Sequence, residues 1–294
     1  MLVALGAGVI TVIGLWYTSR NHKLARQQFA HTQEQFELAQ LQFEQTQAQF
    51  THTQNKDREQ AELAREGHVT DRYVEAIKLL GSANITERLG GIYSLERIMH
   101  DSSRDAKTVI EVLAAFVRSS TQTNDTQSSP DRVSEDAQAA VSVLARRPEN
   151  CKGTLVSLTG ADLRGVQLEG TNLASWDMNS ANLSGANLKD ANLSNALLRG
   201  TALAGAYMYR TNLERADLSK AVLVDANLWG TSMCETTLFQ TDLSTCINLG
   251  RQQILDAVIT HTTTLPAEIT IDEEIEKHMS RGERVADSRD PYNV

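Results

Sequence analysis

The chain is poor in several features that define common protein classes. Its 294 residues include 4 Pro, 17 Gly and 3 Cys, which excludes a collagen-like or proline-rich chain. Cys151, Cys234 and Cys246 are odd in number and form no CxxC pair, so neither a disulfide framework nor a zinc site is indicated and a reducing compartment fits best. With 28 basic against 37 acidic residues, the net charge of -9 disfavours binding to duplex nucleic acid.

Sequence motifs of catalysis are also missing. The chain contains no glycine-rich phosphate loop, no HExxH helix and no GxSxG turn. Its 7 histidines are scattered without metal-ligand spacing, and His261 lies five residues after Asp256, a separation more typical of surface residues than of a catalytic dyad. We therefore expect no enzyme activity, no cofactor and no metal site.

The stretch from Met1 to Ser19 carries no charged side chain. As a helix it would reach about 28 Å, close to the hydrocarbon thickness of roughly 30 Å. Trp16 and Tyr17 suit a membrane interface, and Arg20 begins a basic stretch. This pattern predicts a transmembrane helix over 1–19 in the cell membrane, single-pass, with residues 20–294 cytoplasmic. A buried helix or an oligomer-packing end is the open alternative, and an upstream extension of the natural chain is also open.

A heptad follows over residues 20–66. Between Arg26 and Arg65 there is no Gly or Pro, and phenylalanines recur every seventh residue with Thr or Ala between them. This spacing predicts a coiled-coil stalk that makes the chain a homo-oligomer through residues 26–65. The alternative is a single amphipathic helix packed on the membrane or on the rest of the protein. The seam residues are Phe29, Phe36, Phe43 and Phe50.

Residues 67–150 have the spacing of short helices. We expect helices over 69–80, from Asn84 to Met99, from about Asp105, and over 135–147, with a polar loop at 119–134. The set loosely resembles a pair of HEAT-like hairpins, which is a binding-scaffold geometry.

The strongest pattern has a period of five. Residues 161–245 divide into 17 pentads without an insertion, such as ADLRG, ANLSG and ANLWG, and every third position is Leu or Met. This resembles the A(D/N)LXX signature of the pentapeptide-repeat family. The resemblance implies a right-handed quadrilateral β-helix over 151–250, with four pentads in each coil. The fold class is therefore mixed and multi-part: this solenoid follows a small all-α module and a long N-terminal helix.

Extended backbone alternates its side chains, so the first and third positions of each pentad should point inward and the second and fourth outward. Trp176 occupies a first position, where Ala or Thr is usual, and should distort its coil or turn outward. Residues 251–272 should cap the rod, with a helix over 251–259 that turns Ile254, Leu255 and Val258 toward it. The charged tail 273–294 is expected to be disordered.

The order of anchor, stalk, helical module and rod resembles a bacterial type of membrane-associated pentapeptide-repeat protein. It favours a membrane-tethered protein–protein interaction scaffold whose partner is unknown. The alternative is a DNA-mimicking ligand or inhibitor of DNA gyrase or topoisomerase, but 151–250 holds nine acids against seven bases, too weak a field for a DNA mimic. Folding the pentads four to a coil predicts an outward apolar patch that docks a partner, unless residues 260–271 cover it. Its residues are Ala202, Ala204, Tyr207, Tyr209, Val222, Val224 and Trp229.

Overall fold

The computed structural model describes residues 2–122, 132–151, 153–269 and 271–289; within these, the side chains of 2–13, 65–66, 68, 284 and 286–289 are left aside. The chain forms two compact units, Met1–His68 and Val69–Val294. In the expected membrane segment 1–19, the side chains of residues 2–13 are not described. The end of the expected tail, 290–294, lies outside the described residues.

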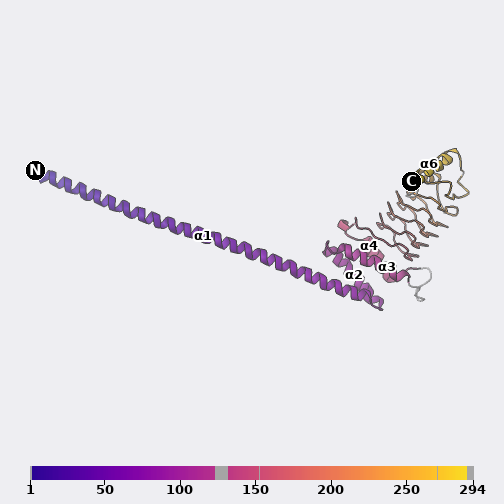
Figure 1. Cartoon of the computed structure of the whole chain (residues 1–294), viewed down its shortest axis with the longest axis horizontal. Coiled ribbons are helices and arrows are strands. Elements are labelled where there is room, and N and C mark those ends of the chain that lie inside the picture. The colour runs from indigo at the N-terminus through magenta and orange to yellow at the C-terminus, as the bar shows by residue number, and fades with distance from the viewer. Residues whose placement is uncertain (1, 123–131, 152, 270, 290–294) are drawn as a thin grey trace. The chain divides into compact units, whose positions relative to one another are not determined.

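The first helix, α1 (Leu2–Leu80), has 79 residues and joins the expected anchor, stalk and first module helix without a break (Figure 1). Gly81 follows its last residue, in agreement with the predicted stop. Every side chain from 14 to 64 is exposed. Among the residues whose side chains are described, which begin at Gly14, no helix has an apolar stretch that could cross a membrane.

Three further helices pack against one another in the second unit: α2 (Ile85–Asp101), α3 (Ala106–Gln122) and α4 (Glu135–Ala145). Asn84 caps α2, because its side chain accepts a hydrogen bond from the Thr86 N–H at 2.9 Å. A short 3₁₀ turn, η1 (Glu149–Cys151), follows α4. The predicted polar loop was wrong at its start, since α3 continues to Gln122, and its residues 123–131 lie outside the description. The HEAT-like likeness stays a prediction.

A buried ion pair joins α2 to α4. Arg88 Nε donates to Asp136 Oδ2 at 2.6 Å, and the Asp136 side chain is 3% exposed. Arg88 Nη1 also donates to the carbonyls of Ser82 and Ala83. Burial alone would raise the pKa of Asp136, but hydrogen bonds from Ser134 and Arg88 outweigh it and hold that pKa below its usual value.

The repeat segment is a rod of stacked coils. Parallel bridges join each second position to the matching position four pentads later, from Ser157 with Asp177 to Asn227 with Ile247, so each coil contains four pentads and has four sides. First and third positions are buried, except for the partly exposed Thr171. Second and fourth positions face outward to varying degrees, except for the buried Ser219 and Thr237. The predicted coil length and alternation are therefore confirmed.

A turn at every fourth and fifth position produces the corners. The next pentad's first N–H donates to the third carbonyl, as Ala186 does to Leu183 at 3.0 Å. In every pentad from 161 to 240 the fifth residue has a positive φ, such as +65° at Gly170 and +62° at Lys220. Non-glycine residues strain in this left-handed region, which explains the glycines at many fifth positions. The sequence reading missed this feature.

Hydrogen bonds also explain the choice of polar residues. At buried first positions, each threonine hydroxyl donates to a carbonyl on the preceding coil, as Thr201 does to Met178 at 3.0 Å and Thr211 to Leu188 at 2.8 Å. At second positions, Asn or Asp accepts from the N–H of the fourth position of the same pentad, as Asn212 does from Glu214 at 2.9 Å. Thr thus satisfies its hydroxyl inside the rod, while Asn and Asp stabilise the corner.

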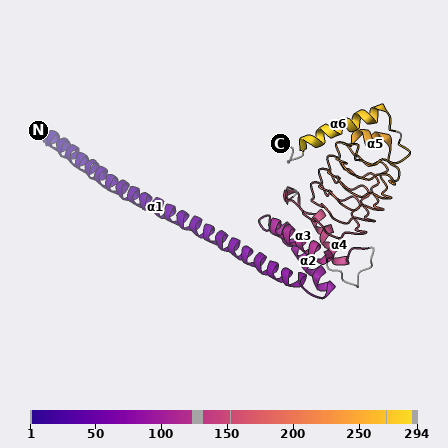
Figure 2. The ribbon, with the colours of Figure 1, turned by 45° about the vertical axis from the view of Figure 1, so that its right-hand side comes forward.

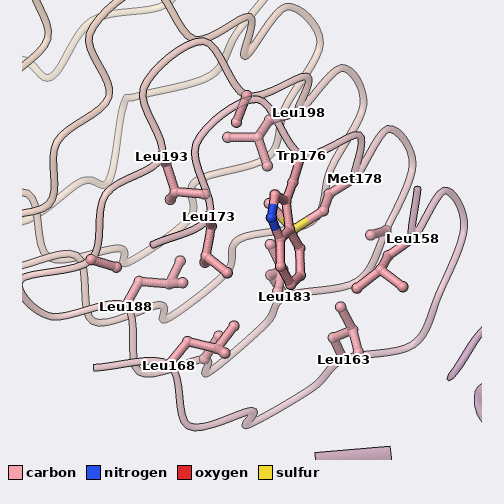
Figure 3. Close-up of a cluster of buried hydrophobic side chains, with 14 of the residues drawn as sticks. Leu158, Leu163, Leu168, Leu173, Trp176, Met178, Leu183, Leu188, Leu193 and Leu198 are labelled. Atoms are coloured by element: carbon pink, nitrogen blue, oxygen red, sulfur yellow. The ribbon is translucent and has the colours of Figure 1, made fainter. Parts of the chain in front are cut away.

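Trp176 neither distorts its coil nor turns outward, so that prediction was wrong. The indole is fully buried and points into the rod beside Leu173 and Met178 (Figure 3). The ladder continues past it, since Asp177 bridges residues on both neighbouring coils. The physical reason is free volume: all four first positions of the following coil are alanine, which leaves room for one large ring. These are Ala181, Ala186, Ala191 and Ala196.

The helical module closes the N-terminal end of the rod (Figure 2). The Arg118 guanidinium donates to the Ser157 carbonyl, and the Asp162 N–H donates to Thr121 Oγ1 at 3.2 Å. Gln138 Oε1 accepts a hydrogen bond from the Gln167 N–H at 2.8 Å, and Gln138 Nε2 donates one to the Gln167 carbonyl at 3.0 Å. These side chains satisfy backbone groups at the open edge of the first coil, which is why α3 extends into the expected loop.

Two shorter segments close the other end. Helix α5 (Arg251–Asp256) buries Ile254 as predicted, and Leu255 is partly buried. The helix stops before the predicted Ile259, because Val258 leaves it to pair with Thr237 and extend the ladder. Further along, Thr264 pairs with Asp242 and also extends the ladder.

The expected disorder of the tail was wrong over most of its length. Residues Glu273–Arg289 form helix α6, which buries Ile275 and Met279. These two apolar residues are four apart and share one helix face. A Cβ added to Gly282 would lie 1.8 Å from the Ile259 carbonyl oxygen, so α6 needs a glycine at this close approach.

Docking of α6 should depend on pH through His261. Its Nε2 lies 2.9 Å from Glu276 Oε1 and its Nδ1 lies 2.6 Å from Glu283 Oε1. Hydrogen bonds to Glu276 and Glu283 raise the pKa of His261. The stability that protonated His261 gives to the docked α6 is therefore fully present below the unfolded pKa of about 6.5. It is lost as pH rises through the raised pKa of the folded state. Histidine NMR titration should give a raised pKa that falls in Glu283→Gln; identical titrations in both chains would contradict the contact.

Candidate interaction surface

The seven residues that the sequence placed on one outward area lie on two neighbouring sides of the rod. We call this set the apolar patch. Ala202 bridges Val222 on one side, and Tyr207 bridges Asn227 on the next. Tyr207 is 60% exposed, Trp229 51%, Val222 44% and Val224 37%, which is unusual for large apolar side chains on a folded surface. The remaining three residues of the patch are partly exposed.

Two aromatic rings give the patch a fixed shape. Tyr209 and Trp229 hold the same position on successive coils, and their rings stack with centroids 4.6 Å apart at an angle of 11°. The guanidinium of Arg210 lies 5.8 Å from the centre of the Tyr209 ring. Stacking on a rigid ladder leaves these side chains with little conformational entropy to lose on binding.

The segment after α5 does not cover the patch. Leu265 and Ile269 pack against the core, and Thr264 continues the ladder, so this stretch extends the end of the rod. The exposed fractions of Val222 and Trp229 are those that remain with residues 260–269 in place.

A hollow of about 460 Å³ adjoins the patch. Glycines at two fifth positions leave room for it, and two tyrosines, two amides and two basic side chains surround it. Sequence reasoning missed this hollow because Arg132 enters it from beyond the repeats. The lining residues are Arg132, Gly165, Gln167, Gly185, Asn187, Lys189, Tyr207 and Tyr209.

Charges on the rod are paired between coils. Lys189 Nζ lies 2.5 Å from Glu169 Oε1, and the hydrogen bond to that carboxylate raises the pKa of Lys189. Arg210 Nε lies 2.9 Å from Asp190 Oδ1. A further pair, Arg215 with Glu235, spans 2.8 Å on other coils. In these three pairs, opposite charges at matching positions of successive coils neutralise one another.

Leu197, which is 41% exposed, lies on the side next to Ala202 and was not included in the patch by the sequence reading. The sequence could have indicated this residue, because Leu197 occupies the second position of its pentad and second positions face outward. Within the described part of the chain, no group of three or more His, Cys, Asp or Glu residues could hold a metal ion.

A model of pentapeptide repeats matches eight copies in this chain, over residues 177–215 and 211–247. The repeat segment belongs to the pentapeptide-repeat family. Each coil of this pentapeptide-repeat rod contains four pentads, as the bridges between successive coils show. No curated protein sequence matches the chain.

Several solved structures of pentapeptide-repeat and related proteins are similar to part of this chain. A pentapeptide repeat protein from the thylakoid lumen of Arabidopsis thaliana is 19% identical, covers 39% of this chain and 77% of its own, and has a TM-score of 0.30. One from Nostoc PCC 7120 is 28% identical, with coverages of 37% and 84% and a TM-score of 0.23. QnrB1, a plasmid-mediated fluoroquinolone resistance protein, is 19% identical, with coverages of 44% and 83% and a TM-score of 0.22.

Proposed function

We propose that this chain is a non-catalytic interaction scaffold whose pentapeptide-repeat rod docks a protein partner on the apolar patch. The observation that carries the proposal is the exposure of Tyr207, Val222 and Trp229 on neighbouring sides of a rigid ladder. Tyr and Trp are enriched among the residues that contribute most to binding energy. The hollow beside Tyr207 and Tyr209 would accept side chains of the partner at the edge of this surface.

Membrane attachment through residues 1–19 is part of the same proposal, with residues 20–294 on the cytoplasmic side. Its support is the absence of charge from Met1 to Ser19 and the basic residues that follow Trp16 and Tyr17. Such a tether would hold the rod near a membrane and raise the local concentration of the scaffold there.

The ion pairs of the rod do not favour the alternative of a DNA-mimicking gyrase ligand. A DNA mimic needs a dense negative field. Here Glu169, Asp190 and Glu235 each have a basic partner within 2.9 Å.

The test is a pair of substitutions within the patch. Tyr207→Ser with Trp229→Ser should weaken binding of the purified partner about 30-fold, the effect expected when residues of this type dominate an interface. The partner is first captured by crosslinking to the wild-type chain and is then titrated by calorimetry.

The matched control is Leu155→Ser, because Leu155 is 60% exposed, as Tyr207 is, but lies outside the patch. It should change the affinity less than about 3-fold. Equal affinities of the patch variant and the wild type, with both chains folded, would rule out docking at this surface.

A further inference from the structure

The phenylalanine seam on α1 is a second unpartnered surface, in the first compact unit. Its four rings are 67–73% exposed. Every side chain from 14 to 64 is exposed, so no other described part of the first compact unit packs on this segment. A helix without packing contacts is only marginally stable in water, since tertiary contacts supply most helical stability. This segment therefore requires a partner along its length.

The seam has a stricter repeat than the phenylalanines alone suggest. From Gln28 to Asn55 the unit Gln-Phe-x-x-Thr/Ala-Gln-x occurs four times in succession without an insertion. Large rings alternate along the seam with small residues three positions later, which are Thr32, Ala39, Thr46 and Thr53. A seven-residue repeat winds a helix into a left-handed supercoil, so the partner must have the same period. An identical chain has that period by definition.

The threonines of the seam are compatible with a dry interface. Thr32 Oγ1 donates to the Gln28 carbonyl at 2.8 Å, and Thr46 Oγ1 donates to the Gln42 carbonyl at 2.7 Å. Their hydroxyls are thus satisfied within the helix, and burial would leave no unmade hydrogen bond.

Glutamine occupies both flanks of the seam in all four repeats. A Gln side chain both donates and accepts hydrogen bonds, so it can pair with another Gln. Flanks with charges of one sign would repel an identical helix, whereas these amides are complementary to themselves. The flanking residues are Gln28, Gln33, Gln35, Gln40, Gln42, Gln47, Gln49 and Gln54.

We propose that the phenylalanine seam binds the same seam of a second copy of this chain and forms a homotypic coiled coil over residues 28–55. This inference is independent of the docking function proposed for the rod. It predicts that α1 gains helical stability only when two copies associate.

The experiment compares full-length chains by analytical ultracentrifugation in mild detergent. Phe36→Ala with Phe43→Ala should raise the dissociation constant of self-association about 100-fold or more, because each copy loses two buried rings. Leu38→Ala with Leu41→Ala is the matched control: these leucines are 62% and 57% exposed on the same stretch but lie off the seam. Its dissociation constant should stay within about 3-fold of the wild type. Circular dichroism should also show helicity that falls on dilution of the wild type.

Three results would overturn the inference. The wild-type chain could sediment as a monomer at all concentrations, the phenylalanine variant could associate as tightly as the wild type, or both variants could weaken equally. Association that survives in the phenylalanine variant but is lost in Tyr207→Ser with Trp229→Ser would assign contact between copies to the rod instead. Partner binding by the patch is measured separately, so either proposal can fail alone.

Discussion

Trp176→Ala should lower the free energy of unfolding by about 3–5 kcal/mol, which is the usual cost of removing a large buried aromatic side chain. Trp176 is fully buried, and the alanines of the following coil cannot expand to fill the space that the indole leaves. The loss should appear in equilibrium urea unfolding of the full chain, followed by circular dichroism.

Two variants make this result specific. Trp229→Ala removes the same residue type from an exposed position and should cost about 1 kcal/mol, the value of one stacked aromatic pair. Trp176→Phe should recover most of the loss, because the Trp176 N–H has no hydrogen-bond partner among the described residues and phenylalanine removes that donor. If Trp176→Ala and Trp229→Ala cost the same, the indole does not support the coil as described.

Breaking the buried ion pair of the helical module should have a similar effect. Arg88→Met leaves the carboxylate of Asp136 buried without its cation, which typically costs about 3–5 kcal/mol. The pKa of Asp136 is held below its usual value in the folded state. The ion pair therefore adds to the free energy of unfolding above the unfolded pKa of about 3.9, and this addition is lost as pH falls through the folded pKa. The deficit of the variant should therefore shrink in acid, as urea unfolding at several pH values would show.

The exposed pair between Arg72 and Asp101 provides the control. Its side chains are 41% and 45% exposed, so Arg72→Met should cost less than about 1 kcal/mol. Replacing both members of the buried pair, with Arg88→Met and Asp136→Leu, should restore much of the lost stability, since no uncompensated charge remains. A double variant as unstable as Arg88→Met alone would show that the cost comes from lost packing.

The interior of the rod was predictable because period five is visible in the residues themselves. Leu or Met at every third position defines the buried row, and four pentads to a coil then place Ala202 beside Val222. Trp176 was misjudged because its pentad was considered alone. The four alanines that make room for it occupy the first positions of the next coil, and the same sequence shows them.

Other features depend on contacts that no local pattern records. Gln138 forms hydrogen bonds with Gln167 only because α4 packs on the first coil. The capping role of the helical module therefore could not be predicted from the sequence pattern. Likewise, α6 has only two buried apolar residues among those described, and its partner, the loop that carries His261, precedes it in a segment without helical period. The hollow beside Tyr207 needs Arg132, which lies outside the repeats.

The closure of both rod ends has a consequence for the solubility of the protein. A bare terminal coil would be an unsatisfied strand edge able to recruit another molecule, and that molecule would offer the same edge again. At one end Arg118, Thr121 and Gln138 bind backbone groups of the first coil, and at the other end α6 packs on residues 257–259, so these backbone groups are less available to a second molecule. End-to-end polymerisation, which would lower the solubility of the protein, is therefore disfavoured at these positions.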